Sequence, residues 1–259
     1  SYVGDPQDTL EQLTTDSNGM TEEIDLAAPP RSYSEYPLSD VQPYSEYNLI
    51  ITAPGYEPTT ISGSEIFSGE LSIQPVRLNP VLPNASASVI NIPANTLWGV
   101  FPPKIPEDEI KPVRSSGEIV LSRVVIPEYV VVHDGVPSDS SATDYYVRYA
   151  DYIKNVASSE IYSTWPEATL RANITAIMSF TLNRVYTEWY RNKGYDFTIT
   201  TSTAYDHKWV YGRNIFDSIS RIVDEIFASY VSRPNVKQPI LTQYCDGKRV
   251  SCPNAMSQW

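Results

Sequence analysis

The distribution of charge and proline changes abruptly along this chain of 259 residues. Residues 1–113 contain 16 acidic and 4 basic residues, whereas residues 114–259 contain 15 of each kind. The first of these segments also holds 15 of the 21 prolines. Because an abrupt change in composition often marks a domain boundary, we expect two domains of different character, with a boundary between residues 80 and 127.

The first segment has the sequence pattern of a small β domain. Short apolar or alternating runs, typical of strands, occur at residues 22–26, 47–53 and 69–78. Pairs of turn-forming residues separate the runs, among them Asn18-Gly19, Pro54-Gly55 and Ser62-Gly63. Short strands at this spacing predict a small β-sandwich over residues 1–80.

Residues 81–124 are rich in proline and show no sustained periodicity. Proline-rich stretches stay extended and semi-rigid, so we expect a linker here. An exposed linker is also where a protease would cut, and an activating protease is therefore a candidate partner of this region.

The rest of the chain, residues 125–259, alternates strand and helix patterns. A β-branched run interrupted at Pro127 predicts one or two strands over residues 117–135. Residues 144–161 begin with strand character and continue with a helical period. A last apolar stripe starts at Asn214 and predicts a further helix. The whole pattern predicts an α+β fold, with a small N-terminal β-sandwich and a larger mixed α/β domain.

The clearest single element is a long helix in the middle of the second segment. We expect Thr164 as its N-cap, Glu167 as the partner in a capping box, and Gly194 as its stop signal. Apolar side chains recur at spacings of three and four, as expected for a helix packed on a core. They are Leu170, Ile174, Ile177, Met178, Thr181, Leu182 and Val185.

Two short motifs stand out in the first segment. Asp16 and Gly19 form a turn pattern ahead of a strand pattern, and Ala53 to Tyr56 stand at the end of a later one. Together they resemble the carboxypeptidase-regulatory-like β-sandwich, a transthyretin-like fold. The usual first strand of the family has no counterpart, so we expect a truncated sandwich. The resemblance implies an adaptor that binds or presents, with a spacer or folding pro-domain as the alternative.

Two separated motifs stand out in the second segment. The first motif is matched by Glu160, Ile161, Trp165, Pro166, Leu170, Ala172 and Leu182. The second is matched by Met256, Ser257 and Gln258. Together they resemble the SpoIID/LytB domain, in a branch similar to the SleC-type spore cortex-lytic enzymes. Met178 stands where the family has Arg, and the chain ends before the last glycine of the second motif, so we expect a divergent domain with a truncated C-terminal end.

SpoIID domains are lytic transglycosylases that cleave denuded peptidoglycan glycan strands, and the resemblance implies this activity. It makes Glu160 the candidate catalytic residue, which protonates the leaving glycosidic oxygen and then takes the proton of the muramic acid C6 hydroxyl. Such a carboxyl needs a pKa raised toward neutrality, which apolar surroundings provide. The candidate glycan contacts, with loop packing as the alternative, are Trp165, Gln243, Tyr244, Ser257 and Gln258.

The two cysteines, Cys245 and Cys252, flank the hairpin turn signal Asp246-Gly247. In an exported protein we expect them to form a disulfide. Some SpoIID proteins bind zinc near this point, but the two histidines, His133 and His207, lie outside metal-ligand spacing. We therefore expect no metal and no other cofactor.

The net charge of −12 argues against a general nucleic-acid partner, and no apolar stretch is long enough for a membrane span. The resemblance implies peptidoglycan glycan strands as the partner. It also implies an extracytoplasmic location, in the spore cortex or cell wall of an endospore-forming bacterium. Two other functions stay open: an inactive module that only binds glycan, and a structural cell-surface or spore-coat protein that interacts through residues 1–80.

Overall fold

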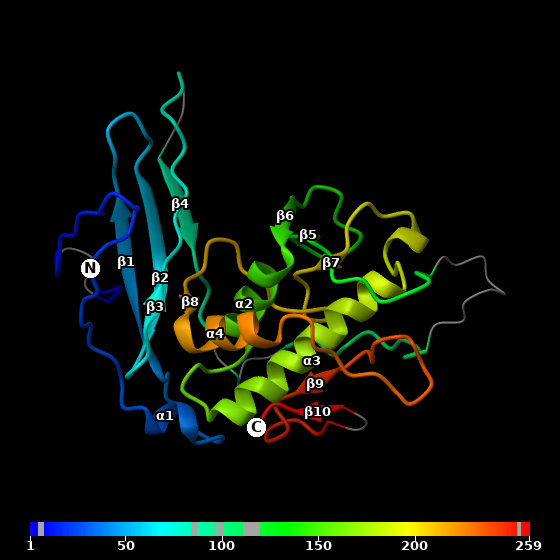
Figure 1. Ribbon diagram of the computed structural model, residues 1–259. Helices are drawn as coiled ribbons and strands as arrows, with labels where there is room; N and C mark the ends of the chain where they lie inside the picture. The colour runs from blue at the N-terminus through cyan, green and yellow to red at the C-terminus, as the bar shows by residue number, and fades with distance from the viewer. Residues whose placement is uncertain (5–7, 84–86, 96, 98–100, 111–119, 253–254) are drawn as a thin grey trace. The chain divides into compact units, whose positions relative to one another are not determined.

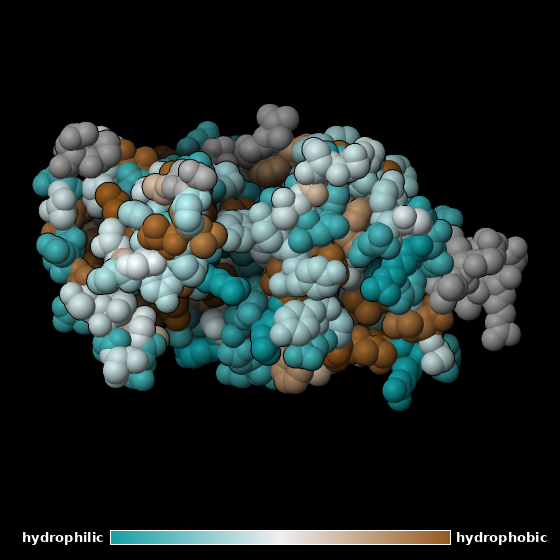
Figure 2. All heavy atoms as spheres, turned by 90° about the horizontal axis from the view of Figure 1, so that it is seen from above, coloured by the Kyte–Doolittle hydropathy of each residue, from teal (hydrophilic) through white to brown (hydrophobic). Residues whose placement is uncertain are grey.

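The computed structural model describes residues 1–259 except 5–7, 84–86, 96, 98–100, 111–119 and 253–254 (Figure 1). It contains both helices and strands, which confirms the prediction of an α+β protein. The described helices include none with the length and hydrophobicity of a membrane-spanning segment. On the face seen in Figure 2, hydrophobic side chains are interspersed among hydrophilic ones.

Contacts within the chain group the residues into two compact units. The first unit consists of Ser1–Ala94 and Tyr211–Asp217, and the second of Asn95–Val210 and Ser218–Trp259. The domain and linker bounds inferred from the sequence stay a prediction. Residues 211–217 come late in the chain but belong to the first unit. The sequence pattern does not indicate this.

The first unit is built on strands and one short helix. Its elements are α1 (Ser32–Glu35), β1 (Tyr44–Ile51), β2 (Thr59–Phe67), β3 (Ser72–Ile73), β4 (Ser88–Asn91) and β8 (Ile215–Phe216). The main sheet has the order β1-β2-β4, with β1 antiparallel and β4 parallel to β2, and β3 pairs with β8. The run at residues 47–53 thus falls largely in β1, whereas residues 22–26 form no strand, so that prediction is wrong.

The pair Ser62-Gly63 lies inside β2, so its prediction as a turn is wrong. Gly63 has a φ of +91°, and a Cβ atom built on it would lie 2.4 Å from the carbonyl oxygen of Ile92. Glycine is needed here because the backbone just after β4 passes too close for a side chain. A glycine in a strand marks such a close approach as readily as a turn, and the sequence pattern does not separate the two.

The core of the first unit explains why residues 211–217 belong to it. Phe67 packs between Tyr44 and Phe216, with ring centroids 5.2 Å apart in both pairs. The guanidinium of Arg213 lies 2.8 Å from the carboxylate of Glu65, and both side chains are fully buried. Since a buried charge needs its partner, this ion pair ties the late segment to β2.

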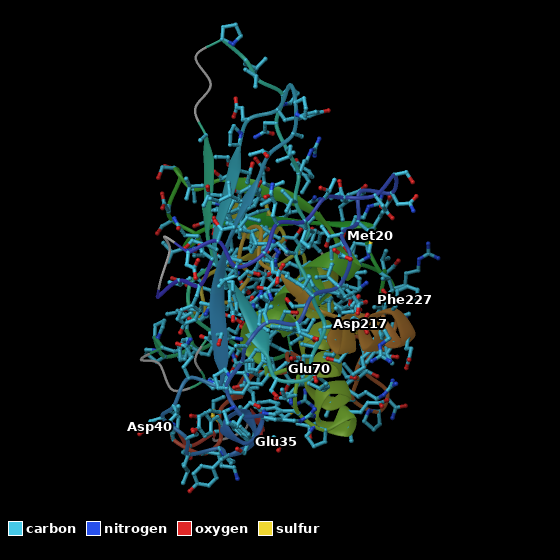
Figure 3. All side chains as sticks on the ribbon, turned by 90° about the vertical axis from the view of Figure 1, so that its left-hand side faces the viewer. Met20, Glu35, Asp40, Glu70, Asp217 and Phe227 are labelled. Atoms are coloured by element: carbon cyan, nitrogen blue, oxygen red, sulfur yellow. A yellow bond between two sulfur atoms is a disulfide. The ribbon has the colours of Figure 1, made fainter. Side chains whose placement is uncertain are left out.

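Figure 3 shows two acidic side chains of the first unit, Glu35 at the end of α1 and Glu70 before β3. Arg31 pairs with both, its Nε lying 2.8 Å from Glu35 and its Nη1 3.7 Å from Glu70. Pairs that involve an exposed arginine contribute less than about 1 kcal/mol each. They balance only part of the acidic excess of the first segment.

The second unit contains the long helices. Its elements are β5 (Tyr129–His133), β6 (Asp144–Arg148), α2 (Tyr149–Glu160), α3 (Glu167–Tyr186), η1 (Arg191–Lys193), β7 (Ile199–Thr200), α4 (Asp217–Ile226, whose first residue is counted in the first unit), β9 (Tyr244–Cys245) and β10 (Met256–Ser257). One sheet has the order β6-β5-β7, and β9 pairs with β10 in parallel. The strand-then-helix prediction for residues 144–161 is confirmed by β6 and α2.

The ends of α3 differ from the prediction. Pro166 is the N-cap, and no side-chain hydrogen bond caps the helix, so the capping box between Thr164 and Glu167 is not formed. The physical reason is that a proline disfavours helical backbone in the residue before it. Glu167 instead pairs with Arg171 at 2.7 Å. The helix also ends well before Gly194, which terminates η1.

Most of α3 is buried, on a wider face than the predicted apolar stripe. Its buried polar residues bond to neighbouring segments; the Asn183 amide, for example, donates to the Pro239 carbonyl at 2.8 Å. The C-terminal strands β9 and β10 run beside α3 in Figure 1, and the Thr242 hydroxyl donates to the Ala176 carbonyl of the helix. α3 is therefore the scaffold on which the C-terminal segment rests.

Two further sequence predictions differ from the structure. The helix expected from Asn214 is shorter, because residues 215 and 216 pair with β3 as strand β8 before α4 begins. The described residues ahead of Pro127, which are 120–126, form no strand, while β5 follows it. The part of that run at residues 117–119 lies outside the described residues.

Candidate functional site

Glu160 is the last residue of α2, and its carboxyl group is held from two sides. Oε1 accepts a hydrogen bond of 2.5 Å from the backbone N–H of Lys208. Oε2 accepts a hydrogen bond from the hydroxyl of Tyr244. The following residue, Ile161, is extended, so α2 ends here and its last side chain faces the loop at residue 208 and strand β9. A carboxyl fixed at both oxygens has a defined orientation.

The surroundings of Glu160 favour its protonated form. Burial of the carboxyl raises the pKa of Glu160 above its ordinary value of 4.5, although the residue as a whole keeps some exposure. The positive charge of Lys104 and the hydrogen bonds from Lys208 and Tyr244 oppose this effect, but burial outweighs them. A carboxyl that keeps its proton nearer to neutral pH is suited to general acid catalysis.

Gln258 connects the second sequence motif to Glu160. Its Nε2 donates to the backbone carbonyl of Glu160 at 3.0 Å, and its own carbonyl accepts from Asn173 of α3 at 2.9 Å. Gln258 is buried, so it braces the end of α2 from within the fold. This placement argues against its predicted role as a glycan contact. The hydrogen bond between Gln258 and Glu160 does bring the two separated motifs together in space.

The other predicted glycan contacts have different surroundings. Trp165 is only 3% exposed and packs against Tyr162 and Trp259, with centroids 5.7 and 4.3 Å away. Its ring cannot stack on a sugar from this position, which argues against that prediction. Ser257 is exposed and Gln243 is partly exposed, and their roles stay predictions.

Tyr244 contacts Glu160 and His207, which the sequence pattern does not indicate. Its hydroxyl donates to Glu160, and its ring stacks on His207 with centroids 5.9 Å apart and planes 15° apart. The Nδ1 of His207 lies 3.1 Å from the hydroxyl of Tyr152. Burial lowers the pKa of His207 well below 6.5, so this ring is neutral at physiological pH.

Lys104 comes from the segment predicted as a linker. Its ammonium donates to the backbone carbonyl of Asp206 and lies 5.5 Å from the ring centroid of Phe180. Burial lowers the pKa of Lys104, while the charges of Glu160 and Asp206 raise it. No spacing or motif in the sequence marks this lysine, since it is one of several isolated basic residues in a proline-rich stretch.

Asp206 is the centre of a buried polar cluster beside the site. Its carboxylate accepts from Arg184 Nε at 2.6 Å, from the Tyr190 hydroxyl at 2.5 Å and from the Thr200 N–H at 2.9 Å. Arg184 also pairs with Glu107 at 2.7 Å. These bonds fix the loop that carries the Lys208 N–H, and so they hold one of the two donors to Glu160 in place.

Cys245 and Cys252 form the predicted disulfide. Their Cα atoms lie 5.9 Å apart, and the Asp246 carboxylate accepts from the backbone N–H of Val250 within the closed loop. The disulfide joins the end of β9 to the approach of β10. The described residues contain no group of three or more His, Cys, Asp or Glu side chains arranged to bind a metal ion.

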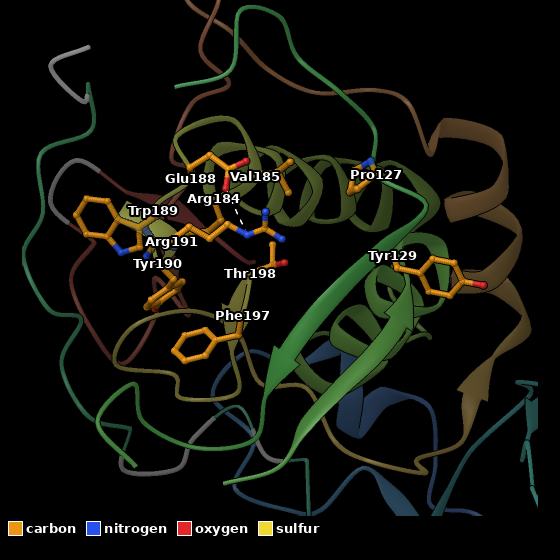
Figure 4. A pocket seen from close by; sticks show the side chains of 10 residues that line it. All are labelled: Pro127, Tyr129, Arg184, Val185, Glu188, Trp189, Tyr190, Arg191, Phe197 and Thr198. Carbon is orange, nitrogen blue, oxygen red and sulfur yellow. Dashed lines mark ion pairs between the residues drawn. The ribbon is translucent and has the colours of Figure 1, made fainter. Parts of the chain in front are cut away.

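A cavity of about 120 Å³ lies elsewhere in the second unit (Figure 4). An ion pair between Glu188 and Arg191, 3.6 Å long, lies at its edge. Glu160 is not among the lining residues, which are Pro127, Tyr129, Arg184, Val185, Glu188, Trp189, Tyr190, Arg191, Phe197 and Thr198. The cavity and the Glu160 site are therefore separate features.

Comparisons of the chain with known protein families, curated proteins and solved structures found no match.

Proposed function

We propose that the second unit is a lytic transglycosylase that cleaves peptidoglycan glycan strands, with Glu160 as its catalytic acid and base. The observation that carries the proposal is the state of the Glu160 carboxyl. It has a raised pKa, its two oxygens accept from Lys208 and Tyr244, and it lies beside the C-terminal motif through Gln258. Sequence resemblance and geometry thus point to the same side chain.

The proposed reaction needs a single carboxyl group. The protonated Glu160 gives its proton to the glycosidic oxygen as the bond between that oxygen and C1 breaks. The resulting carboxylate takes the proton of the muramic acid C6 hydroxyl. The oxygen of that hydroxyl bonds to C1 at the same time, which closes a 1,6-anhydro ring. The proton lost in the first step is regained in the second, and no water is consumed.

Two other carboxylates of the second unit have structural roles. Glu167 is exposed and pairs with Arg171, and Asp206 is occupied by Arg184, Tyr190 and Thr200. A hydrolase of the usual kind needs a second free carboxylate to attack the sugar or activate water. Because both of these carboxylates are paired, the described part of the chain favours the transglycosylase reaction, which needs Glu160 alone.

The proposal extends to the rest of the chain. We infer that the first segment is a carboxypeptidase-regulatory-like sandwich, that residues 81–124 link it to the SpoIID-like domain, and that an activating protease cuts within this linker. The location that fits this activity is the spore cortex or cell wall of an endospore-forming bacterium.

A second candidate is an inactive module that binds glycan strands. Two observations favour it: Met178 stands in the buried core where the family has Arg, and the described cavity does not include Glu160. In this case, Glu160 would be a structural carboxyl. A third function, a structural surface protein acting through residues 1–80, predicts that this segment binds a protein partner.

Glu160→Gln separates these possibilities, with Glu167→Gln as the matched control. Both variants should bind insoluble peptidoglycan and keep the circular dichroism spectrum of the wild type. Mass spectrometry of the soluble fraction should show anhydro-muropeptides from the wild type and from Glu167→Gln but none from Glu160→Gln. Wild-type product yields from Glu160→Gln would end the enzymatic proposal, and binding without product from the wild type would favour the inactive module.

A further inference from the structure

The two hydrogen bonds to Glu160 come from donors of different kinds. The donor to Oε1 is the backbone N–H of Lys208, which every substitution of that residue except proline keeps. The donor to Oε2 is the hydroxyl of Tyr244, which a single atom change removes. The orientation of the carboxyl therefore depends on where the Tyr244 ring is held.

Three features hold that ring. It stacks on His207, with planes 15° apart. Its backbone belongs to β9, which pairs with β10 through Met256. The next residue, Cys245, forms the disulfide with Cys252. A phenol fixed by packing, strand pairing and a covalent bond is preorganised for one geometry.

His207 supports the ring without adding charge. It is fully buried, and burial keeps it neutral. Its Nδ1 is occupied by the Tyr152 hydroxyl, whereas its Nε2 has no hydrogen-bond partner among the described residues. The neutral imidazole gives Tyr244 a flat surface to stack on. Because it carries no charge, it does not shift the pKa of Glu160.

We propose that Tyr244 is a positioning residue for Glu160: its hydroxyl holds Oε2 so that the carboxyl keeps one orientation through both proton transfers. The sequence pattern suggested a glycan contact for Tyr244, and the structure assigns it to the carboxyl instead. The catalytic consequence rests on the function proposed above, whereas the effect of Tyr244 on the carboxyl itself does not.

The hydroxyl also acts on the proton affinity of Glu160. The titratable and charged groups that face the carboxyl are Lys104, Tyr152, Lys208 and Tyr244, with neutral His207 behind them. Donation from Tyr244 favours the carboxylate and lowers the pKa of Glu160, against the larger effect of burial. Removal of this hydroxyl should therefore raise the pKa of Glu160 further.

Tyr244→Phe tests the proposal, because it removes one hydroxyl and keeps the ring that stacks on His207. Tyr195→Phe is the matched control, since Tyr195 belongs to a separate aromatic cluster with Tyr190 and Phe197. Release of anhydro-muropeptides is measured against pH and substrate concentration. In parallel, the pKa of Glu160 is measured by NMR of carbon-13-labelled glutamate carboxyls, with Glu160→Gln used for assignment.

The expected result for Tyr244→Phe is a loss of about tenfold or more in kcat with little change in KM. The pH above which activity falls should move upward, because the acid keeps its proton longer, and the NMR pKa of Glu160 should rise. Tyr195→Phe should leave all three unchanged. A raised NMR pKa of Glu160 in Tyr244→Phe supports the role of Tyr244 in holding the carboxyl, whether or not the protein is an enzyme. Activity that persists in Glu160→Gln would contradict only the enzymatic proposal.

Two results would overturn the inference. One is an unchanged pH profile and an unchanged NMR pKa of Glu160 in Tyr244→Phe. The other is a raised KM with an unchanged kcat, which would mark Tyr244 as a glycan contact that contributes to binding alone.

Discussion

Loss of Arg184 should weaken the second unit more than any surface change. This side chain of α3 is 1% exposed and lies 2.6 Å from Asp206 and 2.7 Å from Glu107. A third bond of 3.0 Å goes to the backbone carbonyl of Tyr205. Arg184→Met keeps most of the side-chain length but removes the guanidinium that pairs directly with both buried carboxylates. Removal of one partner of a buried ion pair costs about 3–5 kcal/mol.

Arg191→Met provides the matched control. Arg191 is 62% exposed and lies 3.6 Å from Glu188, so its removal should change the free energy of unfolding by less than about 1 kcal/mol. Four of the five tryptophans lie among the described residues of the second unit, so tryptophan fluorescence during urea unfolding reports mainly the stability of that unit. The two variants should therefore differ clearly in their urea midpoints.

The double variant Arg184→Met with Asp206→Asn tests the reason for the loss. Because one of the stranded charges is then absent, the double variant should be less destabilised than the sum of the two single variants. Equal midpoints for Arg184→Met and Arg191→Met would refute the reasoning. Strict additivity in the double variant would show that the cost does not come from uncompensated charge.

Three further changes test other parts of the structure. Gly63→Ala should destabilise the first unit more than Gly69→Ala, as measured by hydrogen exchange of the β2 amides. Both glycines have positive φ, but only a Cβ at position 63 meets a backbone atom, and equal protection would contradict this reason. Changing Cys245 and Cys252 together to Ser should lower the free energy of unfolding by about 2–3 kcal/mol, and an unchanged urea midpoint would contradict this. Because burial raises the folded-state pKa of Glu160, the wild type should lose stability relative to Glu160→Gln as pH rises above 4.5, and a pH-independent difference would contradict the assignment.

The sequence predicts local structure best where periodicity and backbone preference agree. The strand and helix over residues 144–161 follow from alternation and then a helical period, and both are present as β6 and α2. The start of α3 is mispredicted because the capping-box pattern at Thr164 competes with the restriction that Pro166 imposes on the residue before it. The helix expected from Asn214 begins late because long-range pairing with β3 overrides the local period.

The site was only partly predictable. Resemblance to a family places Glu160 and Gln258 in two motifs, and the structure brings these residues within hydrogen-bond distance. Lys104 and His207 carry no motif, because their roles depend on burial and on contacts between segments far apart in the chain. Tyr244 was assigned to the sugar from its chemistry, since an exposed phenol and one aimed at a carboxyl look the same in a sequence.

The most direct test of the central claim is the fate of solvent oxygen during glycan cleavage. The wild-type protein is incubated with denuded glycan strands in water labelled with oxygen-18, and the soluble products are analysed by mass spectrometry. If Glu160 acts in turn as acid and base on the sugar itself, the products carry 1,6-anhydro ends without the label, and Glu160→Gln yields none. Labelled reducing ends, or unlabelled anhydro products from Glu160→Gln, would contradict the account.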